Sequence, residues 1–172
     1  MSKAVFFDRD GTINVEVGYL SNFDQFEWID GAIDAIKFCN RNGYLAIVVT
    51  NQSGVARGYY TEADVVKLHN RINEELAKHG AHIDDFFYCP HHPNGAVERY
   101  AVDCQCRKPK PQLILDACRK YSIDKSQSIM IGDAQRDVDA ANNAGVRGVL
   151  FDGINLLNTL KSALDRNDYN LD

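Results

Sequence analysis

Two carboxylates stand one residue apart, directly after an apolar run near the start of the chain. The run 4–7 leads into Asp8 and Asp10, and Gly11 follows. Valine and phenylalanine favour a buried strand and glycine ends it, so both acids are expected where a strand gives way to a loop. Two acids this close suit a hard cation such as Mg²⁺, which binds through oxygen. The alternative, an acidic turn in water, leaves the matching polar segments downstream unexplained.

Three further polar segments lie at the ends of predicted strands or at the start of a predicted helix. They are Thr50-Asn51 after one apolar run, Asp133 and Asp137 after another, and Lys108 in a basic stretch before a helix. Acids, a hydroxyl, an amide and a lysine suit phosphoryl transfer, which depends on charge neutralisation and positioning. In that chemistry a carboxylate can act as nucleophile and form an aspartyl-phosphate.

The elements that position these groups alternate between strands and helices. We expect strands at 4–7, 45–49, 86–88, 128–131 and 148–151, and helices around 32–39, 65–76, 113–118, 138–144 and 154–164. Asp30 and Thr61 are the expected N-caps of the first two helices. This alternation predicts an α/β fold, a Rossmann-like parallel sheet with helices on both faces, in a single domain of residues 1–172. Ligands bind beyond the carboxyl ends of strands in such sheets.

Length, composition and net charge indicate which classes of protein this chain can belong to. The 172 residues are 45% hydrophobic and 25% charged, as in one ordinary globular domain. The net charge of −5 argues against general affinity for nucleic acid or anionic membranes. No apolar run approaches the ~18 residues that span a bilayer, and Asp8 interrupts any apolar signal segment. We therefore expect a cytoplasmic protein with a small-molecule partner and no nucleic-acid or membrane partner. Since no coiled-coil pattern or exposed apolar stripe stands out, we expect a monomer.

A cluster of Cys and His residues lies in the irregular stretch before the third helix. Cys89-Pro90-His91 is separated by twelve residues from Cys104-Gln105-Cys106. Three thiols and an imidazole match a tetrahedral Cys₃His structural zinc site, and cysteines in a reducing compartment ligate metal more readily than they form disulfides. His92 competes with His91 for the imidazole position, and unrelated reduced cysteines are the alternative.

The order of these motifs resembles that of a known superfamily. Asp8-x-Asp10-Gly-Thr, Thr50, Lys108 and Gly132-Asp133-x₃-Asp137 are similar, in this order, to the four motifs of the haloacid dehalogenase superfamily of phosphatases. The match covers nearly the whole chain. The resemblance implies that Asp8 attacks phosphorus and becomes phosphorylated. It also implies that Asp10 protonates the leaving alcohol and then deprotonates the hydrolytic water.

The same resemblance implies roles for the other motif residues. The implied Mg²⁺ ligands are Asp8, the backbone carbonyl of Asp10, and Asp133. Thr50 and Lys108 are expected to hold the phosphoryl oxygens, and Asp137 to orient Lys108 or a metal-bound water. Many relatives carry Lys or Asp directly after the first Asp of the Gly132-Asp133-x₃-Asp137 motif, whereas this chain has Ala134. No side-chain metal ligand is therefore expected from that position, which leaves a contact through its backbone carbonyl as the alternative.

Cap domains of this superfamily are inserted after the first or second motif. The intervals 12–50 and 50–108 hold too few elements for a domain, so we expect a capless enzyme with an open site. A capless subgroup with a zinc loop shares the Cys-x-His arrangement, which favours His91 over His92. The resemblance implies a structural, non-catalytic Zn²⁺ that orders the loop of about 89–108 and delivers Arg107 and Lys108. The implied zinc ligands are Cys89, His91, Cys104 and Cys106.

This subgroup includes heptose bisphosphate phosphatases and histidinol-phosphate phosphatases. The stretches 50–60, 89–93 and 104–109 resemble the heptose group more closely. That group removes the C7 phosphate of a heptose 1,7-bisphosphate and leaves the C1 phosphate for nucleotide activation, on the route to lipopolysaccharide or other surface polysaccharides. The expected substrate-binding residues are Glu16, Val17, Gly18, Tyr19, Thr50, Asn51, Gln52, Ser53, Arg107 and Lys108. Histidinol phosphate is the alternative substrate, and a non-catalytic zinc-bearing binding module is the alternative of another class.

Overall fold

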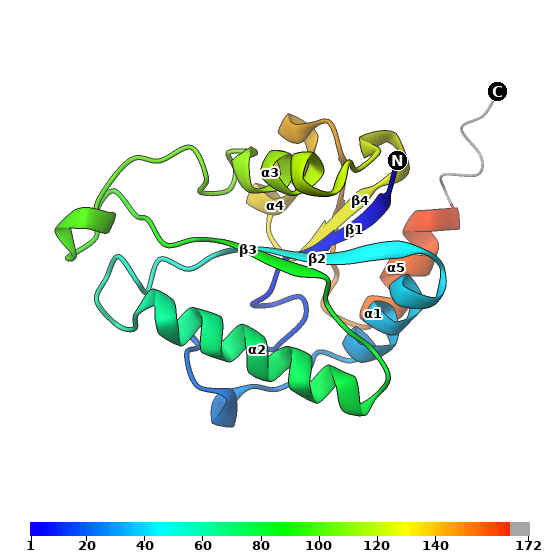
Figure 1. The fold of residues 1–172 in the computed structure, drawn as a ribbon, viewed down its shortest axis with the longest axis horizontal. Helices are drawn as coiled ribbons and strands as arrows, with labels where there is room; N and C mark the ends of the chain where they lie inside the picture. The colour runs from blue at the N-terminus through cyan, green and yellow to red at the C-terminus, as the bar shows by residue number, and fades with distance from the viewer. Residues whose placement is uncertain (166–172) are drawn as a thin grey trace.

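Five strands form one parallel sheet in the computed structural model, which describes residues 1–165 (Figure 1). The strands are β1 (Lys3–Phe7), β2 (Tyr44–Asn51), β3 (Asp85–Cys89), β4 (Ile129–Gly132) and β5 (Arg147–Leu150). Their order in the sheet is β3-β2-β1-β4-β5, and every neighbouring pair is parallel. The predicted parallel α/β fold is therefore confirmed. Residues 166–172 of the predicted domain lie outside the described residues.

Helices cover both faces of the sheet (Figure 1). They are α1 (Ala32–Arg41), α2 (Glu62–Lys78), α3 (Gln112–Tyr121), α4 (Gln135–Ala144) and α5 (Leu156–Asp165). Side chains alternate along β1, so Val5 and Phe7 pack with α1, α2 and α5, whereas Ala4 and Phe6 pack with α3 and α4. Because both faces are buried, the middle parts of β1, β2 and β4 consist of apolar residues, at 4–7, 45–49 and 129–131.

The connection between β3 and α3 extends away from the sheet (Figure 1). Short 3₁₀ helices interrupt this and two other loops, at Phe23–Gln25, Glu98–Tyr100 and Lys125–Gln127. The backbone N–H of Val97 donates to the carbonyl of Ala56 at 2.9 Å, so this connection lies against the loop after β2. The hydroxyls of Tyr88 and Tyr100 both donate to Glu62, at 2.8 and 2.6 Å. These bonds fasten the Cys- and His-bearing loop to the start of α2.

The N-terminal ends of α1 and α2 can be compared with the N-caps predicted at Asp30 and Thr61. Thr61 and Asp64 make both bonds of a capping box at α2, as expected. At α1 the prediction is wrong, because the N-cap is Gly31, at φ 79°, with no side-chain bond. A Cβ there would lie 2.4 Å from Oδ1 of Asn155, and the Asp30 carbonyl accepts from the N–H at the start of α5. Packing against α5, rather than a local cap, fixes this end.

None of the helices within residues 1–165 has the length and apolar character needed to cross a membrane.

Candidate active site

Three acidic side chains meet at the carboxyl edge of the sheet. Asp8 follows β1, Asp133 follows β4, and Asp137 lies in the first turn of α4. One carboxylate oxygen from each falls in a group whose members all lie within 4.8 Å of one another. The sequence motifs are more than a hundred residues apart, and the parallel order of β1 and β4 brings them together.

Lys108 joins two of these acids, Asp8 and Asp137, and is almost fully buried. Its Nζ donates to Oδ1 of Asp8 and Oδ1 of Asp137, each at 2.7 Å, and to the Val49 carbonyl at 2.8 Å. Burial alone would lower the pKa of Lys108, but the two carboxylates raise it. Burial raises the pKa of Asp8, against the opposing effect of Lys108. The ammonium thus offsets part of the repulsion between two carboxylates held out of water.

Asn51 fixes the backbone on which Lys108 is carried. Its Nδ2 donates to the Lys108 carbonyl at 3.1 Å, and its Oδ1 accepts from the Lys108 N–H at 2.9 Å. Both ends of the amide are therefore used inside the protein. We expected Asn51 among the substrate-binding residues, and its geometry assigns it first to positioning Lys108.

Asp10 is turned away from Lys108 and toward a second buried cation, Arg9. Arg9 is fully buried and makes three contacts with the Asp10 carboxylate, at 3.0 to 3.2 Å. Asn14 Nδ2 and Gln52 Nε2 each donate to the same carboxylate at 3.0 Å. Gln52 also donates to Thr50 Oγ1 at 2.9 Å. One network therefore fixes Asp10 and Thr50, the predicted acid–base residue and a predicted phosphoryl ligand.

His69, on α2, extends this network through a contact with Arg9. Its Nε2 lies 3.1 Å from Nη1 of Arg9 and its ring stacks on Phe86 with centroids 4.3 Å apart. Since guanidinium only donates, Nε2 must accept, and the imidazole is neutral. Burial, followed by the charge of Arg9, holds the pKa of His69 well below its usual range.

We expect this neutral histidine to make stability fall in mild acid. The unfolded chain protonates His69 near pH ~6.5 while the folded protein does not, so the contribution is fully present above that pH and is lost below it. One proton corresponds to about 1.4 kcal/mol per pH unit, hence about 2 kcal/mol between pH 6.5 and 5. Urea unfolding at both pH values measures the change. His69→Gln, which keeps an acceptor, should remove this part of the slope.

The matched control is His79→Gln, because His79 is exposed at the end of the same helix. It should keep the wild-type pH dependence. Equal slopes for wild type and His69→Gln would contradict the assignment of His69 as a buried neutral acceptor.

The acidic group fits a small hard cation. Asp137 uses one oxygen for Lys108 and the other for the Ala134 N–H at 3.1 Å, whereas Asp8 gives only Oδ1 to Lys108 and Asp133 is exposed. Asp8 and Asp133 are therefore the carboxylates with an oxygen left for a cation. Gly11, at φ 86°, lies so close to Asp133 that an added Cβ would stand 2.2 Å from its Oδ2. An all-oxygen donor set with few protein ligands is what Mg²⁺ prefers. The Asp10 side chain is held by Arg9, so from that residue the backbone carbonyl is the predicted ligand.

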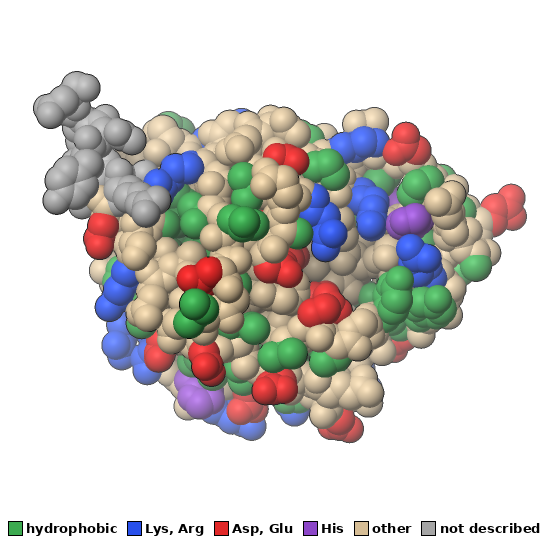
Figure 2. Space-filling model, turned by 180° about the vertical axis from the view of Figure 1, so that it is seen from behind, with side chains coloured by type: hydrophobic (Ala, Val, Ile, Leu, Met, Phe, Trp, Pro, Cys, Tyr) green, Lys and Arg blue, Asp and Glu red, His purple; other side chains and the backbone are tan. Residues whose placement is uncertain are grey.

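A cavity of about 340 Å³ lies beside this site and is lined by Asp10. Seven of the predicted substrate-binding residues line it: Glu16, Gly18, Tyr19, Asn51, Gln52, Ser53 and Arg107. The other three predicted residues lie outside the lining, with Thr50 and Lys108 buried and Val17 exposed. Tyr60 and Arg136 also line the cavity and were not predicted. Figure 2 shows a face on which Lys and Arg side chains gather at the edge of a hollow, opposite acidic side chains.

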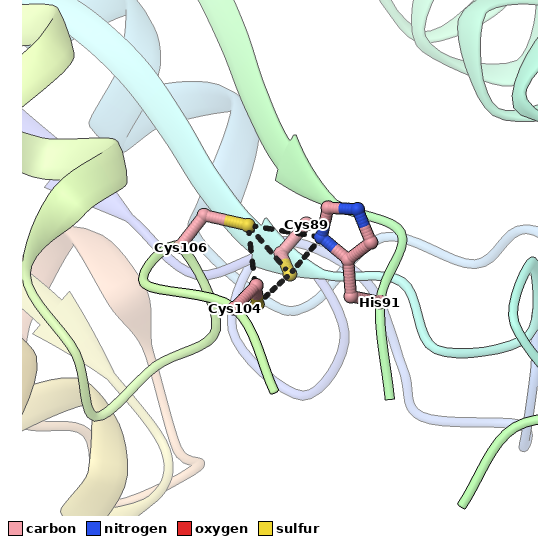
Figure 3. A group of neighbouring side chains, drawn as sticks. All are labelled: Cys89, His91, Cys104 and Cys106. Carbon is pink, nitrogen blue, oxygen red and sulfur yellow. Dashed lines mark hydrogen bonds between the residues drawn. The ribbon is translucent and has the colours of Figure 1, made fainter. Parts of the chain in front are cut away.

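The Cys and His residues form a second group at the end of β3, where their side chains point toward one another (Figure 3). The Sγ atoms of Cys89, Cys104 and Cys106 lie 2.9 to 3.5 Å apart, and His91 Nδ1 lies 3.3 and 3.7 Å from two of them. Tetrahedral Zn–S bonds of ~2.3 Å put ligand atoms roughly 3.8 Å apart, close to this arrangement. His92 is outside the group, with its Nε2 3.4 Å from Arg57.

Comparisons with known proteins agree with this geometry. A family model described as HAD-hydrolase-like matches residues 105–170. Two relatives are named D-glycero-beta-D-manno-heptose-1,7-bisphosphate 7-phosphatase. The protein from Pasteurella multocida is 44% identical over 151 residues, which cover 88% of this chain and 82% of the relative. The protein from Escherichia coli K12 is 47% identical over 143 residues, which cover 83% of this chain and 75% of the relative.

A solved structure supports the same relationship. The crystal structure of D,D-heptose 1,7-bisphosphate phosphatase from B. bronchiseptica, complexed with magnesium and phosphate, is similar with a TM-score of 0.80 and 28% identity. The match covers 95% of this chain and 99% of that one. The chain therefore belongs to the haloacid dehalogenase-like family of D-glycero-β-D-manno-heptose-1,7-bisphosphate 7-phosphatases.

Proposed function

We propose that this protein is an Mg²⁺-dependent phosphatase that removes the C7 phosphate of D-glycero-D-manno-heptose 1,7-bisphosphate. The observation that carries the proposal is the 44–47% identity, over most of the chain, to enzymes of that name. Further support comes from Asp8, Lys108 and the nearby Asp133, together with a polar cavity that Asp10 lines. The product keeps its C1 phosphate, which a later nucleotide activation of the sugar requires.

The first chemical step belongs to Asp8 and Asp10. A carboxylate oxygen of Asp8 forms a bond to phosphorus as the bond between phosphorus and the C7 oxygen breaks. Asp10, held by Arg9 and Gln52, gives its proton to the leaving oxygen. Lys108 donates to Asp8 and would stabilise the negative charge that develops on the phosphoryl oxygens. The products of this step are the sugar alcohol and a phosphorylated Asp8.

The second step reverses the proton transfer. Asp10, now a carboxylate, takes a proton from a water molecule, whose oxygen attacks phosphorus and releases Asp8 and inorganic phosphate. Asp8, Asp133 and the carbonyl of Asp10 would hold Mg²⁺, which supplies positive charge against the phosphoryl group. Thr50 Oγ1, which accepts from Gln52 Nε2 at 2.9 Å, would donate its own proton to a phosphoryl oxygen.

The proposed reaction is tested by phosphate release from a panel of substrates. The arms are α- and β-heptose 1,7-bisphosphate and histidinol phosphate, each with Mg²⁺ and with a chelator. We expect turnover of a heptose bisphosphate with Mg²⁺ and none with the chelator. Turnover of histidinol phosphate alone would overturn the substrate assignment. No turnover by folded, metal-loaded protein would favour the binding-module alternative.

We further propose that Cys89, His91, Cys104 and Cys106 hold a structural Zn²⁺. Four protein ligands leave no open position for catalysis. The loop they would order carries Arg107 and Lys108 back toward the acidic group, and Lys110 Nζ donates to the Cys104 carbonyl at 2.6 Å. The support is the convergence of the three thiols and the imidazole.

Loss of this zinc is expected to lower stability. Purified protein should hold one zinc per chain by elemental analysis, and His91→Ala should lose it. We expect His91→Ala to unfold about 5 °C or more below wild type, since a few kcal/mol shifts Tm by several degrees in a domain of this size. His92→Ala is the matched control and should keep both zinc and Tm. Zinc retained by His91→Ala but lost by His92→Ala would reverse the ligand assignment.

We also propose that the protein acts as a cytoplasmic monomer. All five cysteines are free in the structure, which suits a reducing compartment. Gel filtration of the metal-loaded protein tests the oligomeric state.

A further inference from the structure

Two arginines line the cavity without a bonding partner in the described part of the chain. Arg107, from the Cys- and His-bearing loop, is half-buried, and its buried Nη1 has no hydrogen-bond acceptor. Arg136, from the first turn of α4, is exposed and forms no ion pair or hydrogen bond with residues 1–165. A buried guanidinium nitrogen without an acceptor costs free energy. Such a group is expected to gain its acceptor from a ligand.

The two charges also lie close enough to repel each other. Burial lowers the pKa of Arg107, and the neighbouring charges of Arg136 and Arg57 lower it further. Arg57 already contacts His92 and lies over the Tyr19 ring at 5.7 Å. Arg107 and Arg136 are therefore the pair that remains free to bind an anion.

The position of Arg136 is unfavourable for the helix that carries it. The N-terminal turn of α4 has a positive dipole end, which disfavours a cation, and the N-cap is Ala134, which has no capping group. Arg136 thus lowers the stability of α4, and it lines a cavity together with a second unpaired arginine. Binding of a ligand explains this position better than a role in the fold does.

We infer that Arg136 is a specificity-determining residue that, together with Arg107, binds the distal phosphate of the substrate, the one that is not cleaved. The inference rests on the proposed function. In the proposed reaction the phosphate that is cleaved contacts Asp8 and Lys108, which do not line the cavity, whereas Asp10 does. The second phosphate of a sugar bisphosphate bound next to Asp10 is then expected in the part of the cavity that Arg107 and Arg136 line. A phosphate dianion accepts from guanidinium groups with good geometry, and two such groups match its charge.

The test compares two substrates that differ only in the distal phosphate. These are heptose 1,7-bisphosphate and heptose 7-phosphate, assayed by phosphate release with wild type, Arg136→Gln and Arg136→Lys. Arg119→Gln is the matched control, because Arg119 carries the same charge on the surface of α3 with its side chain 74% exposed. Unfolding in urea verifies that each variant is folded.

Arg136→Gln should raise KM for the bisphosphate about 10- to 100-fold, the loss of one charge-assisted hydrogen bond, with kcat nearly unchanged. The kcat/KM of Arg136→Gln for heptose 7-phosphate should stay within about twofold of wild type. Arg136→Lys, which keeps the charge, should recover part of the loss on the bisphosphate. Arg119→Gln should behave as wild type on both substrates. An unchanged KM, or an equal loss on both substrates, would overturn the inference.

The wild-type enzyme separates this inference from the proposed function. If it hydrolyses both heptose phosphates equally well, no distal-phosphate site exists, although the proposed reaction stands. If it hydrolyses neither, the proposed function and the inference both fail.

Discussion

Replacing Asp8 with asparagine is expected to lower kcat by about 10⁴-fold or more, because the amide cannot attack phosphorus. The substitution keeps the shape of the side chain and removes one of the two carboxylates bonded to Lys108. Lys108 keeps its bonds to Asp137 and to the Val49 carbonyl, so the variant should fold. Phosphate release and urea unfolding, measured on the same preparation, separate chemistry from stability.

Asp137→Asn provides the matched control for Asp8→Asn. Both carboxylates accept from Lys108 Nζ at 2.7 Å, and both are buried. If Asp8 served only as a partner of Lys108, the two variants would be equally impaired. We expect Asp137→Asn to keep measurable turnover, at least tenfold above that of Asp8→Asn. Equal rates for the two would contradict the role of Asp8 as nucleophile.

Replacing Lys108 with methionine is expected to cost about 3–5 kcal/mol of folding free energy and to abolish turnover. Methionine fills similar volume but leaves two carboxylates, 5% and 0% exposed, facing each other without a cation. It also leaves the Val49 carbonyl without its donor. The free energy of unfolding in urea gives the magnitude directly.

A triple variant tests the electrostatic cause of this loss. Lys108→Met combined with Asp8→Asn and Asp137→Asn removes the buried charges, so most of the lost stability should return while activity stays absent. Lys120→Met is the surface control, since Lys120 pairs with Asp85 with its side chain 58% exposed, and should cost less than about 1 kcal/mol. A triple variant as unstable as Lys108→Met would instead assign the loss to packing.

Much of the fold could be predicted because its local signals are strong. The apolar run before Asp8 and the capping box at Thr61 are read from neighbouring residues alone, and both elements occur as expected. The predicted cap at Asp30 was wrong because Asn155, 124 residues after Gly31 and next to α5, packs against Gly31. Long-range packing of this kind leaves no mark in a local pattern.

The site residues, too, could be predicted where the sequence carries a motif and not where only spatial contacts identify them. The grouping of Asp8, Lys108 and Asp133 could be predicted from their motifs. Asp8 and Asp133 directly follow strands, and Lys108 belongs to a basic segment before a helix. Arg136 was missed because it occupies an unspecified position inside the last motif, where only the cavity identifies it. The positioning role of Asn51 was also hidden, since its partner lies 57 residues away in the sequence.

The measurement that tests the central claim most directly is a ³¹P NMR time course of heptose 1,7-bisphosphate hydrolysis by the Mg²⁺-loaded protein. It distinguishes the phosphate that leaves from the one that stays. We predict loss of the C7 monoester signal, growth of inorganic phosphate and retention of the anomeric C1 signal. Loss of the C1 signal first, or spectra that do not change with folded enzyme present, would contradict the proposed function.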